Sequence, residues 1–111
     1  MSVALTTVAG VQQPSIDTII RMVAPVFGVT KLDVLSHRRD RSATLARHTG
    51  MWLARRLTTK SLPQIGMFFD RDHTTVLDGI RRIEALLDVN PGVGQVVLSL
   101  MDSLTLPAVA Q

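Results

Sequence analysis

The sequence has 111 residues, enough for one domain with a single modest core and too few for a second, catalytic domain. It contains no Cys, which excludes disulfides and thiolate metal sites. A net charge of +3 and a pI of about 10.6 favour a polyanionic partner.

Basic residues are concentrated in the middle of the chain. Residues 1–30 are neutral overall, whereas residues 31–82 carry eleven Lys and Arg against five Asp. Residues 83–111 carry three acidic side chains and no basic one. No apolar run has the length of a membrane span, and the start lacks the positive segment of a signal peptide. We therefore expect a soluble, cytoplasmic, nucleoid-associated protein without a membrane contact.

The N-terminal third predicts an arm followed by two helices. Residues 1–13 have no caps, no charge and little periodicity, so we expect a flexible arm, either a free tail or a segment that docks on a partner. Ser15 is expected to open a helix that Gly28 ends in a left-handed conformation. Thr30 and Asp33 form a capping-box pattern, which predicts a second, short helix.

A basic loop follows at residues 37–42, with Arg38, Arg39 and Arg41 in four positions. Such a run is either a solvated surface or a contact for phosphates and for a narrow, strongly negative minor groove. Ser42 is expected to cap a long helix over residues 43–57.

The long helix over residues 43–57 has an apolar side and a basic side. Trp52 is expected to be a core anchor rather than a platform for stacked bases. The opposite, exposed side is predicted to show Arg47, His48, Arg55 and Arg56. Of these, Arg55 is placed to reach a phosphate, because it lies one turn before the next motif.

Residues 61–87 predict a helix-turn-helix, in which the second helix enters the major groove. Ser61 and Gln64 form a capping-box pattern with Pro63 in the first turn, and this helix should end near Phe69. Helical spacing predicts one apolar face for this helix, made by Leu62, Ile65, Phe68 and Phe69. Asp72 is expected to cap a second helix over residues 73–87.

The first turn of the second helix consists of polar side chains that can meet base edges. Thr offers a hydroxyl or a methyl to thymine, His donates or accepts, and Asp accepts from cytosine N4. Asp72 is either the helix cap, a cytosine contact, or both. The candidate base-contacting residues of this turn are Asp72, His73, Thr74 and Thr75.

The C-terminal part predicts one more helix, over residues 91–104, with Asn90 as its cap and Pro91 at its first position. This helix has more apolar residues than one core-facing stripe would contain. They either close over the first helix or form a partner or dimer surface. The domain is therefore expected to span residues 14–104, followed by a short tail at residues 105–111.

Residues 71–77, RDHTTVL, closely resemble the signature of the C-terminal DNA-binding domain of the bacterial replication initiator DnaA. Three further stretches match that family in the same order, namely RRDRS at 38–42, ARRLT at 54–58 and SLPQIG at 61–66. The resemblance covers residues 15–87. It implies an all-α, compact bundle of about six helices with a helix-turn-helix, of the Trp-repressor-like kind.

The resemblance also implies roles for individual residues. The stretch from Asp72 to Thr75 would read bases in the major groove, and Arg39 would enter the minor groove. Leu62 and Pro63 match positions that touch thymine methyls. The implied phosphate contacts lie in the basic loop and around the two helices, at Arg38, Arg41, Arg55, Lys60, Ser61 and Arg71.

Two features depart from the family pattern. The family usually has a Gly-Gly pair before the signature Arg, whereas this chain has Phe69-Asp70-Arg71, which is one residue shorter and lacks Gly. The nucleotide-binding region of the initiator is also absent, because no G-x-x-x-x-G-K-[ST] motif occurs. We expect no ATPase activity from these residues.

Other enzyme classes find no support in the sequence. His37, His48 and His73 lack metal-ligand spacing, and no Ser lies in a nucleophile motif. We expect no enzyme, no cofactor and no metal, but a bacterial or phage protein that binds double-stranded DNA sequence-specifically. A transcription regulator with a protein partner on its C-terminal helix or N-terminal arm is the first hypothesis. A replication-associated factor on origin-like sites is the second, and an interaction module without DNA binding is the third.

Overall fold

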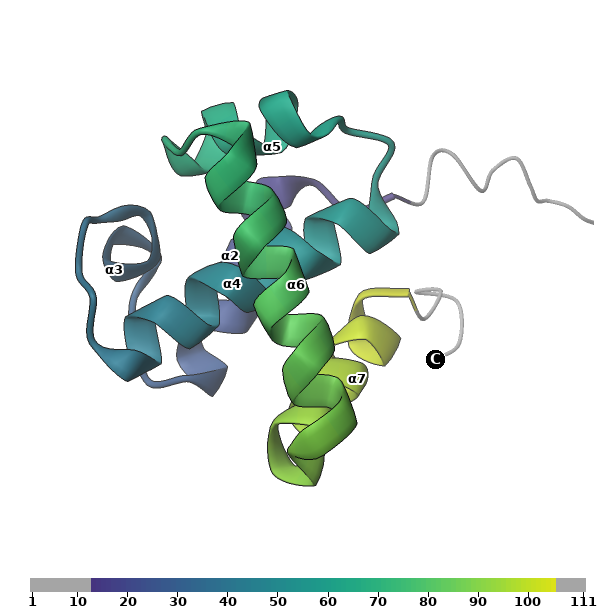
Figure 1. The fold of residues 1–111 in the computed structure, drawn as a ribbon. Coiled ribbons are helices and arrows are strands. Elements are labelled where there is room, and N and C mark those ends of the chain that lie inside the picture. Colours follow the sequence, from purple (N-terminus) through teal and green to yellow (C-terminus); the bar gives the residue numbers. More distant parts are fainter. Residues whose placement is uncertain (1–12, 106–111) are drawn as a thin grey trace, which may run out of the picture.

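The computed structural model describes residues 13–105, which form six α-helices and no β-strand (Figure 1). The helices are α2 (Ile16–Val26), α3 (Lys31–Leu35), α4 (Arg41–Leu57), α5 (Leu62–Phe69), α6 (His73–Val89) and α7 (Pro91–Thr105). This confirms the predicted all-α class and the number of helices. The predicted arm up to residue 12 and the tail from residue 106 lie outside the described residues. Within residues 13–105, no helix is long and apolar enough to cross a membrane.

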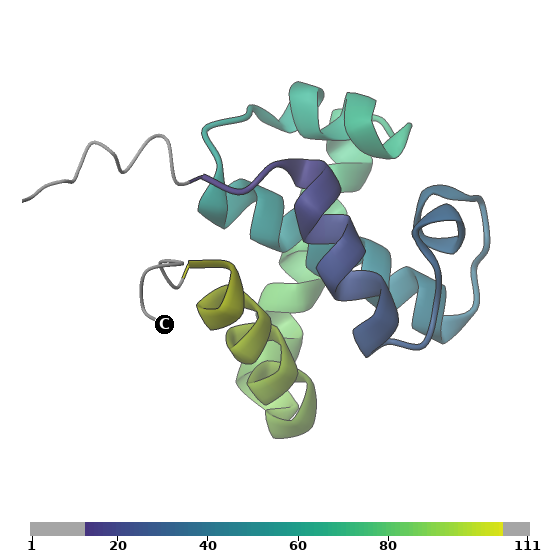
Figure 2. The same cartoon turned by 180° about the vertical axis from the view of Figure 1, so that it is seen from behind.

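Helix α4 is the central element and contacts all five other helices. Helix α6 covers one side of α4 and α2 covers the other, as the views from the front and from behind show (Figures 1 and 2). Trp52 on α4 is only 2% exposed, which confirms its predicted role as a core anchor. Small residues on α4 let neighbours approach closely, since a Cβ on Gly50 would lie 3.1 Å from the ring of Phe69.

Local hydrogen bonds start the helices largely as predicted. The capping boxes of Thr30 with Asp33 and of Ser61 with Gln64 both form. Asp72 caps α6, and the Asn90 side chain accepts from the Val93 N–H at the start of α7. Gly28 has a φ of 73°, as expected for the residue that ends α2.

The turn between α5 and α6 is closed by Asp70, the residue at which the chain departs from the family pattern. Its φ is 56°, and its N–H and that of Arg71 donate to the carbonyls of Met67 and Gly66 at 3.3 and 2.8 Å. This is a Schellman motif, in which Asp70 adopts the left-handed conformation that Gly usually supplies. The turn is therefore compact although it lacks a Gly-Gly pair.

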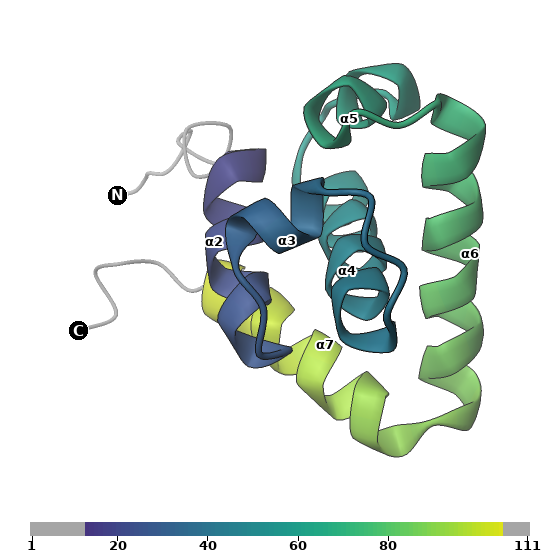
Figure 3. The same ribbon diagram turned by 90° about the vertical axis from the view of Figure 1, so that its left-hand side faces the viewer.

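Helix α7 contacts α6, α4 and α2, running back from the end of α6 toward α2 (Figure 3). Its Val97 and Leu100 are buried, so this helix closes the core, in agreement with the first of its two predicted roles. Leu98 remains 47% exposed. A partner surface on this helix stays a prediction.

Four details of the sequence analysis need correction. Helix α4 begins at Arg41 and is capped by Asp40, whose carboxylate accepts from the Ala43 N–H, and not by Ser42. Helices α6 and α7 extend to Val89 and Thr105, one or two residues beyond their predicted ends. Phe68 is 42% exposed, because only Phe69 of this pair fits against Gly50. Arg47, predicted on the exposed side of α4, is only 6% exposed.

Candidate nucleic-acid interface

The N-terminal end of α6 presents the four predicted base-contacting residues, Asp72 to Thr75, and all four are exposed. The Asp72 carboxylate accepts from the Thr74 N–H at 3.3 Å and also from the Thr74 hydroxyl. Its other oxygen lies 3.5 Å from Nδ1 of His73. The hydrogen bond from the Thr74 hydroxyl is the main reason why the pKa of Asp72 lies below its usual value.

This geometry shows that Asp72 is a cap, and it still leaves acceptor capacity for a base. An ionised carboxylate has about four lone-pair positions, of which the contacts with Thr74 use only part. The same contacts orient the hydroxyl of Thr74 and the imidazole of His73 at the tip of the helix. The helix tip therefore offers donors, acceptors and a methyl group, the set that reads base edges in a major groove.

The start of α5 lies beside this helix tip. A surface hollow of about 380 Å³ is lined by Pro63, Gly66 and Met67 from α5 and by residues 70–73. Pro63 is exposed and Leu62 is half-buried. Ser61 uses its hydroxyl in the capping box, where it accepts from the Gln64 N–H at 3.3 Å. The structure thus brings the predicted thymine-contacting Pro63 close to His73.

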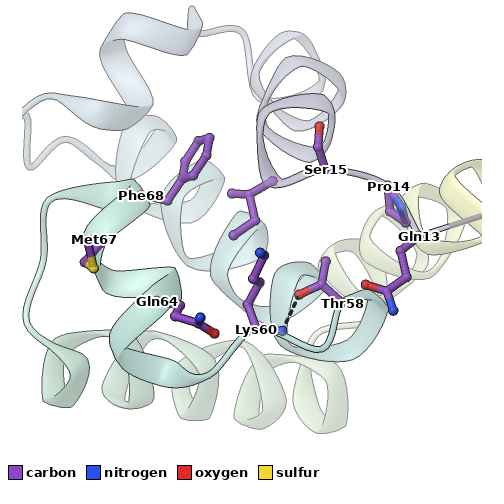
Figure 4. Close-up of a pocket in the computed structure, with 9 residues that line it drawn as sticks. Gln13, Pro14, Ser15, Thr58, Lys60, Gln64, Met67 and Phe68 are labelled. Carbon is purple, nitrogen blue, oxygen red and sulfur yellow. Dashed lines mark hydrogen bonds between the residues drawn. The ribbon is translucent and has the colours of Figure 1, made fainter. Parts of the chain in front are cut away.

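Lys60 lies at a separate pocket of about 720 Å³, between the segment leading into α2 and helix α5 (Figure 4). Its backbone N–H donates to the Thr58 hydroxyl at 3.2 Å. The side chains of Met67 and Phe68 line the same pocket (Figure 4). Arg55, in the last turn of α4, is exposed.

The basic loop and the first residue of α4 contain arginines that are ion-paired and arginines that are not. Arg38 forms ion pairs with Asp40 at 2.7 Å and with Asp33 at 3.0 Å, and these carboxylates raise its pKa. Arg39 and Arg41 form no ion pair within residues 13–105. Both line a hollow of about 520 Å³ together with His48 and Arg82. Arg39 is therefore better placed than Arg38 to meet a new anionic partner.

Arg71 links the helix-turn-helix to the basic loop. Its guanidinium donates to the carbonyl of Phe69 at 2.9 Å and to the carbonyl of Ser36 at 2.6 Å. Ser36 lies at the C-terminal end of α3, directly before the basic loop. A phosphate contact by Arg71 stays a prediction, and in this structure the side chain first of all joins two parts of the candidate interface.

Arg47 is the residue of this region that the sequence analysis missed. The sequence pattern predicts an exposed side chain, but the position of Arg47 between Ala46 and Gly50 lies on the buried face of α4. Its guanidinium donates to backbone carbonyls of α3 and of the basic loop. Helical spacing could have placed Arg47 on this face, although spacing could not have identified its partners.

His48 is half-buried on α4, where burial first and the charge of Arg82 next lower its pKa below 6.5. The unfolded chain then binds a proton on His48 at a higher pH than the folded chain does. We expect the free energy of unfolding to fall as pH drops below about 6.5, by up to about 1.4 kcal/mol per pH unit. His48→Gln should make this slope smaller. Urea denaturation from pH 7.5 to 5 measures it, and identical slopes would contradict the assignment.

Comparison with known proteins identifies the family. The family described as the bacterial dnaA protein helix-turn-helix matches residues 16–83, which include α2 through most of α6. The chain belongs to this family. The chromosomal replication initiator protein DnaA of Caulobacter sp. (strain K31) is 47% identical over 88 residues, covering 78% of this chain and 18% of that protein.

Two further relatives show similar coverage. DnaA of Caulobacter vibrioides (strain NA1000 / CB15N) is 49% identical over 79 residues, which are 70% of this chain and 16% of that protein. DnaA of Bradyrhizobium sp. (strain ORS 278) is 43% identical over 90 residues, which are 80% of this chain and 19% of that protein. The chain thus spans less than a fifth of the length of these relatives, and it carries the helix-turn-helix DNA-binding domain of the DnaA family.

Proposed function

We propose that this chain binds double-stranded DNA sequence-specifically, at sites related to the boxes that DnaA recognises. The observation that carries the proposal is the first turn of α6, where Asp72, His73, Thr74 and Thr75 are exposed beyond a compact helix-turn-helix. In this docking the tip of α6 enters the major groove, with Leu62 and Pro63 against thymine methyls. Arg39 enters the adjacent minor groove, whose narrow form attracts Arg.

The basic residues around these contacts supply the attraction to phosphate. Arg41, Arg55 and Lys60 are exposed. Arg38 reaches a phosphate by exchanging a carboxylate partner described above. Arg71 reaches one with the guanidinium donors that its bonds to carbonyls leave free. Ser61 offers its hydroxyl in the same way. Each phosphate that such side chains neutralise makes binding more dependent on salt.

A replication-associated role is the biological function that we favour. The relatives reported above are all chromosomal replication initiator proteins, which supports the second hypothesis of the sequence analysis more than the first. We place the chain on origin-like sites, where it acts through DNA binding. Locating its binding sites across a bacterial genome tests this, since sites confined to promoters would favour transcription regulation instead.

Base reading by α6 predicts a loss that depends on the DNA sequence. His73→Ala and Thr74→Ala should each cost about 1–3 kcal/mol on the preferred site and little on random DNA. The preferred site is obtained by selection from a random pool with the wild-type chain. Gln95→Ala, an exposed uncharged residue on α7, serves as the control and should change neither affinity. Equal losses on both DNAs would remove these two side chains from base reading.

A further inference from the structure

The guanidinium of Arg47 is surrounded by backbone carbonyls that come from two segments of the chain. Its Nε donates to the carbonyl of Val34 at 2.7 Å, within α3. One terminal nitrogen donates to the carbonyls of Ser36 and Arg38 at 3.0 Å each. A side chain of α4 thus satisfies both the last turn of α3 and the entry of the basic loop.

This burial would be costly without those partners. Desolvation lowers the pKa of Arg47, and the charge of Arg71 lowers it further, yet a guanidinium stays protonated at any physiological pH. A buried charge needs hydrogen bonds to compensate for lost water, and here carbonyl oxygens supply them. The aliphatic part of the Arg47 side chain is buried in the core, and its guanidinium donors form a planar fork. The carbonyls that accept from this fork are therefore held in fixed positions.

The hydrogen bonds of Arg47 connect to the helix-turn-helix through one shared acceptor, the carbonyl oxygen of Ser36. The carbonyl oxygen of Ser36 accepts from Arg47 at 3.0 Å and from Arg71 at 2.6 Å. Arg71 lies in the turn just before the tip of α6, and Arg39 follows Arg38, whose carbonyl Arg47 also binds. The basic loop and the tip of α6 are therefore tied to each other by hydrogen bonds that do not involve DNA.

We propose that Arg47 is a positioning residue, which sets the place of Arg39 relative to the tip of α6 and so couples minor-groove to major-groove recognition. The inference rests on the proposed function. Arg47 is 6% exposed and does not itself reach DNA. Its effect on binding must then pass through Arg39. Because the loop is held in place, the DNA segment bound by Arg39 and the segment bound by α6 must lie at one fixed spacing.

A double-mutant cycle between Arg47→Lys and Arg39→Ala tests the proposal. Lys keeps the charge but lacks the planar fork, so it cannot satisfy the separate carbonyls together. We expect Arg47→Lys to weaken binding to the preferred site about tenfold in the wild-type background, and less than about twofold once Arg39 is Ala. Arg21→Lys is the control, since Arg21 is exposed and pairs with Asp17 on α2.

Three results with these variants would overturn the proposal. Equal losses in both backgrounds would mean that Arg47 supports the fold in general. A salt slope that falls by about 1 in Arg47→Lys would mean that Arg47 touches a phosphate itself. Unchanged affinity in Arg47→Lys would likewise overturn it. If instead the wild-type chain shows no preferred site, the proposed function fails and not the coupling alone.

A second measurement leaves Arg47 unchanged, so it tests the proposal even if Arg47→Lys does not fold. Selections with Arg39→Ala and with His73→Ala locate the minor-groove and major-groove segments of the preferred site. One base pair is then inserted between them. A fixed loop predicts that the wild-type chain loses about as much affinity on this DNA as Arg39→Ala loses on the original. Full tolerance of the insertion would show that the loop moves freely, and would overturn the proposal.

Discussion

Replacing Phe69 by Ala is expected to lower the free energy of unfolding by about 3–5 kcal/mol, the range for a large aromatic side chain lost from a core. Phe69 is fully buried at the end of α5, and its ring packs against Gly50 on α4. Its loss leaves a cavity where the helix-turn-helix meets the central helix. Urea denaturation followed by circular dichroism measures the change.

The neighbouring Phe68 provides a matched control of the same chemistry. Because its side chain is 42% exposed, Phe68→Ala should cost only about 1 kcal/mol or less. The comparison tests the register of α5, which matters because the following turn is one residue shorter than is usual in the family. A larger loss for Phe68→Ala than for Phe69→Ala would show that the register is wrong by one residue.

Gly66→Ala is expected to cost about 3 kcal/mol, at the upper end of the range for overpacking. A Cβ on Gly66 would approach the carbonyl oxygen of Arg71 closer than 3.0 Å, a separation that real Cβ atoms essentially never show. That oxygen belongs to the backbone of the turn, so the turn itself must move. Helix propensity, which favours Ala over Gly by about 1 kcal/mol, offsets only part of this cost.

Gly94→Ala is the matched control for Gly66→Ala. Gly94 also lies inside a helix, but its nearest neighbours, atoms of Leu87, would be 3.7 Å or more from a new Cβ. This substitution should therefore stabilise the protein by about 0.5–1 kcal/mol. Melting temperatures of both variants, with affinity for the preferred DNA site, check the pair. An unchanged melting temperature in Gly66→Ala would contradict the close contact between Gly66 of α5 and the Arg71 carbonyl of the turn.

Short-range features of this protein could be read from the sequence. The caps at Thr30, Ser61, Asp72 and Asn90 join groups within three residues, so residue type and spacing suffice to predict them. The signature at residues 71–77 added the family, which the comparisons confirm. The roles of individual residues in DNA contact remain predictions.

Choices between neighbouring residues could not be read in the same way. Asp40 and Ser42 are both good caps, and the chain begins α4 at Asp40. Phe68 and Phe69 both continue the apolar face of α5, and only the space beside Gly50 distinguishes them. In each pair the local pattern is nearly the same, so contacts with distant residues decide.

The sequence by itself determined the helices, most of their caps and the family, because these depend on periodicity and on bonds between near neighbours. Only the tertiary structure decided what the arginines do. Arg39 is left without an ion pair within the described residues, whereas Arg47 and Arg71 meet at the carbonyl of Ser36, 11 and 35 residues away along the chain. An arginine is buried only where enough unpaired acceptors converge on it, and that convergence depends on how the helices pack.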